Sequence, residues 1–83
     1  MFMIAYSKQA LRFLRRMPAD QATLIREKIE IYATNPKALV GQVKKLEGRD
    51  GYRLRVGRWR ILFVHTGNVL EIIKIGPPGG VYQ

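Results

Sequence analysis

GYRLRVGRWR, residues 51–60, predicts a β-hairpin, and the rest of the fold can be built outward from it. Gly57-Arg58 separates two strand-like runs, and a Gly-X pair there is typical of a two-residue type II′ turn. Because side chains alternate along a strand, Arg53 and Arg55 are expected on one face and their apolar neighbours on the other. The hairpin therefore presents a rigid basic surface. Guanidinium groups held on strands are well suited to the phosphate backbone of an RNA.

Two further strands are predicted around this hairpin. Gly67-Asn68 gives a second type II′ signal, so a strand over 59–66 should turn back into a strand over 69–75. Both runs are apolar on both faces, which places them at the centre of the sheet. Residues 2–6, rich in apolar and aromatic side chains, predict a first strand.

Two helices are predicted between the first strand and the hairpin. Ser7 is placed to cap a helix over 8–17, which has one apolar and one cationic face. Pro18 fits the first turn of a second helix, and Asn35-Pro36 ends it. Residues 37–48 show weak periodicity and are expected to form a connector with about one helical turn.

The predicted element order is β-α-α-β-β-β. It indicates an α+β fold in which two N-terminal helices pack on a mainly antiparallel, four-stranded sheet. Because the chain has only 83 residues, we expect one domain, 1–83, with a thin core.

Composition narrows the choice of partners. Fifteen Lys plus Arg against six Asp plus Glu give a formal charge of +9, which favours acidic partners. Nucleic acid, an anionic membrane surface and an acidic protein all meet that requirement, so charge alone leaves the function open. The chain has no cysteine, which excludes a disulfide frame and a thiolate metal site and suits a reducing compartment. No apolar run has the length of a signal sequence or a membrane span, so we expect a cytoplasmic protein without a membrane partner.

Four segments together carry a family resemblance. They are the two N-terminal helices, Val43-Lys44-Lys45-Leu46-Glu47-Gly48, the block from Tyr52 to Ile61, and Ile75-Gly76 through Val81-Tyr82. With them, nearly the whole chain resembles the RelE/ParE superfamily of bacterial toxins, and in particular the RelE branch of ribosome-dependent mRNA endonucleases. The block from Tyr52 to Ile61 is quite specific, whereas the helices are not.

The resemblance implies the toxin of a type II toxin–antitoxin system. Such a toxin enters the ribosomal A site and cleaves mRNA, with the ribose 2′-hydroxyl attacking the scissile phosphate, and a cognate acidic antitoxin holds it inactive. We expect a metal-independent endoribonuclease with no cofactor, since neither paired carboxylates nor a His-rich set is visible in the sequence. The implied catalytic residues are Arg53, Arg55 and Arg60, which would stabilise the phosphate, and Tyr82, which would orient the nucleotide or assist proton transfer.

Further basic residues are expected around this centre. Lys45, Arg49 and Arg58 are predicted to bind substrate, together with Pro78, which stands where relatives usually carry arginine. Arg12, Arg15 and Arg16 are predicted to contact ribosomal RNA, although a solvated helix face predicts the same three residues. Trp59 and His65 are expected to be packing residues, since they share a strand face with Ile61 and Phe63.

Two departures from the family pattern keep other functions open. Glu47 stands where relatives often have a basic residue, and Pro78 offers neither a charge nor an N–H to a phosphate. One alternative is a ParE-like inhibitor of DNA gyrase, which shares the fold without an RNA-cutting site. The other is a catalytically inactive toxin variant that binds RNA or the ribosome.

Overall fold

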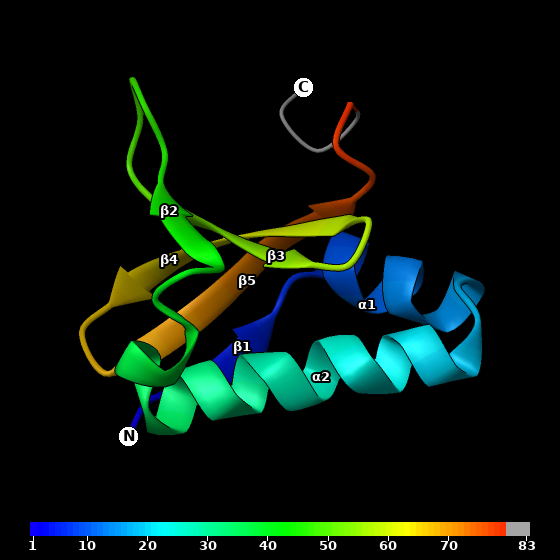
Figure 1. Ribbon diagram of the computed structural model, residues 1–83, viewed down its shortest axis with the longest axis horizontal. Coiled ribbons are helices and arrows are strands. Elements are labelled where there is room, and N and C mark those ends of the chain that lie inside the picture. The colour runs from blue at the N-terminus through cyan, green and yellow to red at the C-terminus, as the bar shows by residue number, and fades with distance from the viewer. Residues whose placement is uncertain (80–83) are drawn as a thin grey trace.

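A mixed β-sheet organises the protein. In the computed structural model, which describes residues 1–79, the strand order is β1-β5-β4-β3-β2 (Figure 1). β1 pairs with β5 in parallel, and the other neighbours pair antiparallel. The strands are β1 (Met3–Tyr6), β2 (Val43–Lys45), β3 (Tyr52–Val56), β4 (Trp59–Thr66) and β5 (Val69–Gly76).

The sheet has five strands, so the predicted four-stranded sheet is wrong by one strand. The additional strand is β2, which falls inside the segment 37–48 that was expected to be a connector. It is three residues long with a single apolar side chain, so it shows no alternation that a sequence pattern could reveal. It forms as an edge strand on β3, with Lys44 opposite Arg53. The expected helical turn in the connector is present as η1 (Pro36–Leu39).

Both hairpin turns have the predicted type. Gly57 and Gly67 have φ angles of 58° and 59°, and no non-glycine residue within 1–79 has a positive φ. A positive φ at only the first central residue identifies type II′ rather than type I′. The turns therefore set the register of β3 on β4 and of β4 on β5.

Both helices cover the same face of the sheet (Figure 1). They are α1 (Lys8–Arg16), capped by Ser7 Oγ at 3.0 Å from the Ala10 N–H, and α2 (Ala19–Thr34). Their buried apolar residues and those of β3, β4 and β5 form one core. Within residues 1–79, no helix has the length and apolar character needed to cross a membrane.

A side-chain amide ties α1 to the end of β5. β1 ends before β5 does, and Gln9 of α1 continues the pairing: its Nε2 donates to the Ile75 carbonyl, and its Oε1 accepts from the Ile75 N–H, both at 3.0 Å. The carboxamide thus takes the place of a strand residue. Since only Gly76, the last residue of β5, separates Ile75 from the loop 77–79, this contact also positions that loop.

Candidate functional site

The sheet face opposite the helices carries a cluster of cations. Leu54 and Val56 of β3 are buried in the core beneath the helices, so Arg53 and Arg55, which alternate with them, point to the opposite face. Directly opposed residues of an antiparallel pair share a face, and Arg60 lies opposite Arg55. The structure therefore brings the three predicted arginines onto one surface.

Two rows of opposed residues cross this surface, which we call the open face. The first row is Lys44, Arg53, Leu62 and Lys74, and the second is Arg55, Arg60 and Gly76. Neighbouring strands lie about 4.8 Å apart, so an anion resting on either row is within reach of more than one cation. Arg53 is half-buried, and its Nε atom has almost no exposed surface, whereas Arg55 is exposed.

Arg60 is held in place by backbone carbonyls of the hairpin turn. One terminal guanidinium nitrogen donates to the carbonyls of Gly57 and Trp59, each at 3.1 Å. A guanidinium has five N–H donors in a rigid fork, so these bonds fix its position and leave donors for an anion. Gly76 lies opposite Arg60, and Pro77 and Pro78 follow it as exposed residues. The predicted position of Pro78 is thus two residues beyond the second row.

Two lysines of the open face were not among the site residues predicted from the sequence. Lys44 lies in the unexpected strand β2. Lys74 shares its parity with the buried Ile72, so plain alternation would put it on the helix side. A β-bulge makes the difference: Leu62 pairs with Lys74 and Phe63 with Ile72, leaving Ile73 as the additional residue. The bulge turns both Ile73 and Lys74 outward.

The other predicted substrate residues are spread more widely. Lys45 lies opposite Tyr52, so the register directs it away from the face of Arg53. The Arg58 guanidinium lies 4.8 Å from the centre of the Trp59 ring, at the tip of the hairpin. Arg49 lies in the β2–β3 connection and borders a hollow beside Lys74. Tyr82, the fourth predicted catalytic residue, lies outside the described residues.

The three arginines predicted to contact the ribosome form a separate group. Arg12, Arg15 and Arg16 are exposed on α1, which packs on the helix side of the sheet. Arg15 and Arg16 occupy the last turn, where a positive charge interacts favourably with the helix dipole even if the residue contacts no RNA. The structure keeps this group apart from the open face.

Trp59 and His65 both lie on the helix side, as their strand parity predicts. Trp59 Nε1 donates to Gln21 Oε1 at 2.7 Å, and its ring meets the edge of Phe13. His65 Nε2 lies 3.1 Å from the Tyr32 hydroxyl, among the rings of Phe2, Tyr52 and Phe63. Burial, and the neighbouring Tyr52 to a smaller extent, raise the pKa of Tyr32 above its ordinary value. These contacts join the helices to β3 and β4.

No group of three or more His, Cys, Asp or Glu side chains within residues 1–79 is arranged to hold a metal ion. What the open face offers instead is fixed positive charge on adjacent strands. Such a surface can bind a phosphodiester and stabilise negative charge that develops on its oxygens.

No family model and no curated protein matches the sequence, but solved structures match its fold. The archaeal RelE of the RelE–RelB complex from Pyrococcus horikoshii OT3 is 27% identical, covers 96% of this chain and 98% of its own, and has a TM-score of 0.80. The chain has the fold of the RelE/ParE toxins.

Two other toxins extend this likeness. The intact E. coli RelBE toxin–antitoxin complex matches with a TM-score of 0.75 at 18% identity, over 93% of this chain and 96% of that one. A YoeB/ParE toxin from Agrobacterium tumefaciens matches with a TM-score of 0.73 at 19% identity, over 92% and 98%. In this RelE/ParE fold the open face is the surface of the sheet that the two helices leave uncovered. The last two identities are low, so these two structures establish the fold alone.

Proposed function

We propose that this protein is the toxin of a type II toxin–antitoxin system and cleaves mRNA on the ribosome in the bacterial or archaeal cytoplasm. The observation that carries the proposal is the meeting of Arg53, Arg55 and Arg60 on the open face, beside the loop that follows Gly76. The RelE-like fold supports it, since the same arrangement of strands underlies toxins crystallised with RelB antitoxins.

The proposed chemistry is transfer of the scissile phosphate to the ribose 2′-hydroxyl. The 2′-oxygen loses its proton and attacks phosphorus, and the 5′-oxygen leaves and takes up a proton. Arg53, Arg55 and Arg60 act by neutralising the phosphoryl oxygens as charge builds on them, and arginine itself is a poor base because its pKa exceeds about 12. Tyr82 is proposed to orient the nucleotide or to assist proton transfer.

Pro78 is expected to limit the rate. Loss of one donor to a developing oxyanion lowers a rate by about 100-fold to 1,000-fold, and proline has no side-chain donor and no N–H. Pro78→Arg should therefore increase the cleavage of mRNA on programmed ribosomes, by up to that factor. Pro77→Arg adds the same charge to the same loop one residue earlier and serves as the matched control.

The cleavage assay also separates the alternatives. If neither the wild-type chain nor Pro78→Arg cuts mRNA on ribosomes, the nuclease proposal fails. Pro78 and Glu47 favour a ParE-like activity. Such an activity would instead appear as inhibition of DNA supercoiling by gyrase. Ribosome binding without cleavage by the wild-type chain, together with cleavage by Pro78→Arg, would identify an inactive variant of the same toxin.

An acidic antitoxin is the proposed partner. The open face and the net charge of +9 favour an acidic segment lying across the cations, which would also exclude RNA. Co-expression with the neighbouring reading frame tests this proposal: a complex should form, and it should be weaker with Arg55→Gln than with Lys45→Gln.

A further inference from the structure

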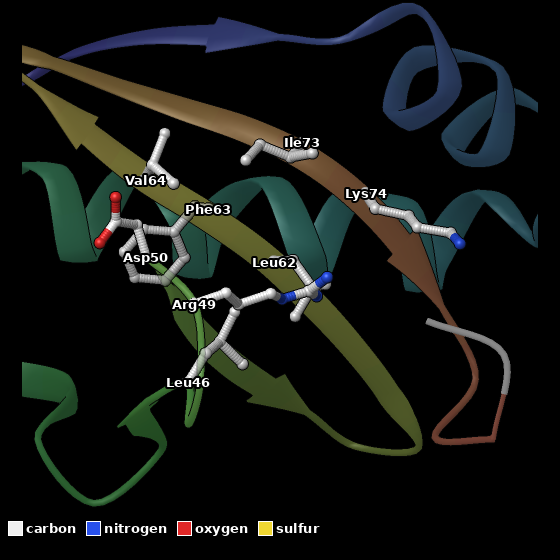
Figure 2. Close-up of a pocket in the computed structure, with 8 residues that line it drawn as sticks. All are labelled: Leu46, Arg49, Asp50, Leu62, Phe63, Val64, Ile73 and Lys74. Carbon is white, nitrogen blue, oxygen red and sulfur yellow. The ribbon is translucent and has the colours of Figure 1, made fainter. Parts of the chain in front are cut away.

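A hollow on the open face lies directly beside the arginines. It has a volume of about 360 Å³, within the range of small-molecule sites. The β2–β3 connection forms one wall and the bulge of β5 the other, and β4 forms the floor (Figure 2). The lining residues are Leu46, Arg49, Asp50, Leu62, Phe63, Val64, Ile73 and Lys74.

The floor of the hollow is apolar although no helix covers it. Leu62 is 3% exposed and lies outside the core cluster beneath the helices. Ile73, which the bulge turns outward, is 46% exposed. Apolar side chains on an otherwise cationic surface point to a ligand that is partly apolar and partly anionic. A purely anionic ligand would not need the apolar side chains, and a purely apolar one would not need the cations.

The rim of the hollow is polar and of mixed charge. Figure 2 shows the Asp50 carboxylate at one end, beside Val64, and Arg49 and Lys74 toward the other end. A carboxylate accepts hydrogen bonds from the N–H groups of a nucleobase, whereas a guanidinium donates to base acceptors and stacks on ring faces. The hollow thus offers an apolar surface for a ring and both kinds of hydrogen-bonding group at its edge.

The hollow also continues the row of cations. Arg53 lies directly opposite Leu62, which is part of the floor. A nucleotide whose phosphate rests on Arg53 and Arg55 would therefore carry its base to the edge of this cavity. In single-stranded nucleic acid the base is unpaired and can turn into such a pocket.

We propose that this hollow binds one nucleobase of the RNA strand and sets the nucleotide preference of the protein. This inference rests on the proposed RNA-cleaving function and adds to it a pocket formed by the β2–β3 connection and the β5 bulge. The exposed Ile73 and the partly exposed Val64 supply the surface on which the ring lies, above the buried Leu62, and Asp50 selects bases that present N–H donors to it.

Site-specific blocking provides the test. The chain has no cysteine, so Ile73→Cys creates a single site whose alkylation by N-ethylmaleimide places a bulky group in the hollow. The control is Ile31→Cys treated in the same way, because Ile31 is 41% exposed and lies on α2, on the other side of the sheet. The probes are a 2′-O-methylated hexanucleotide RNA, which cannot be cleaved through its 2′-hydroxyls, and versions of it with one abasic position each.

With the Ile73→Cys protein before alkylation, one abasic position should weaken binding by about 5- to 10-fold, the lower end of the range for stacking contacts. Alkylated Ile73→Cys should bind that abasic RNA and the intact RNA equally, while alkylated Ile31→Cys still distinguishes them. Asp50→Asn should change the order of preference among the four bases at the same position.

The outcomes separate the pocket from the function as a whole. If alkylated Ile73→Cys still distinguishes intact from abasic RNA, the proposal of a base pocket is wrong, whereas the proposal that the protein binds RNA is unaffected. If no abasic position weakens binding, but Arg55→Gln does, the protein contacts only the backbone and the pocket is again wrong. If the wild-type chain binds none of the probes and cuts no mRNA on ribosomes, both proposals fall.

Discussion

Arg55 and Arg60 lie directly opposite one another across β3 and β4, so two guanidinium groups share one face of the sheet at neighbouring positions. Like charges at opposed positions of a sheet destabilise it. Arg60 is further fixed by the carbonyls of Gly57 and Trp59. An arrangement that opposes folding and is nevertheless held rigidly is typical of a binding site for an anion.

Arg55→Gln should therefore make the folded protein more stable. We expect its free energy of unfolding to rise by about 0.2–1 kcal/mol at low salt, because the opposed charge on Arg60 loses its neighbour. The gain should shrink in 0.5 M salt, where charges are screened over a few ångströms. Urea denaturation at the two salt concentrations measures this, with Lys45→Gln as the control. A loss of stability at low salt would contradict the prediction.

The same substitution should weaken RNA binding in a salt-dependent way. Each phosphate contact with single-stranded nucleic acid contributes about 0.7 to the slope of log K against log salt concentration. Arg55→Gln should reduce the slope by about that amount, whereas Lys45→Gln, which faces away from Arg53, should leave it unchanged. Equal slopes for the two variants would mean that the open face has no special role in binding.

Gln9→Ala should loosen the end of β5. Both hydrogen bonds between the Gln9 side chain and Ile75 would be lost, and the Ile75 backbone groups would lose their partners at a half-buried site. We expect a loss of about 2 kcal/mol in the free energy of unfolding and faster amide exchange at Ile75. Gln42→Ala, at an exposed position, is the control. A change below about 0.5 kcal/mol would show that water replaces the amide without cost.

Gly51→Ala should destabilise the protein because of both its backbone angle and its surroundings. Gly51 has a φ of 117°, and an added Cβ would lie 3.0 Å from the Phe63 carbonyl oxygen. We expect a loss of more than about 1 kcal/mol. Gly41→Ala is the matched control, since nothing lies within 4 Å of its added Cβ and its φ is not positive. Thermal unfolding of both variants gives the comparison.

Stability at alkaline pH should depend on Tyr32. Burial raises the pKa of its phenol, with a smaller effect from Tyr52, so the folded state holds the phenolic proton more tightly than the unfolded state. This contribution is complete below about pH 10, the ordinary pKa, and is lost as the pH rises through the folded-state pKa. Urea unfolding between pH 8 and 11 should show a smaller alkaline loss for Tyr32→Phe.

The Tyr32→Phe comparison has a second readout. At pH 8 the variant should be less stable by about 1 kcal/mol, because His65 loses its hydrogen-bonding partner. The pKa of Tyr6 is also raised by burial, so part of the alkaline loss should remain in the variant. An identical alkaline loss in both proteins would show that Tyr32 ionises as readily in the folded state as in the unfolded one.

Local patterns predicted most of the fold. The strands at 52–56 and 59–66, the turns at Gly57 and Gly67 and both helices depend on alternation, helical spacing and glycine, all of which act over a few residues. The sequence does not reveal β2, because three residues carry no period and their own composition does not show that they pair with another strand. The fifth strand thus enters only through contact with β3.

Strand parity and a two-residue turn follow from local stereochemistry, so the sequence alone predicts that Arg53 and Arg55 share a face and that Arg60 lies near the start of the next strand. The folded sheet is needed to show that Lys74 joins them and that an apolar hollow opens beside Leu62. The bulge in β5 and the attachment of the β2–β3 connection arise from pairing between strands. Such pairing is a property of the assembled sheet, and no short stretch of the chain contains it.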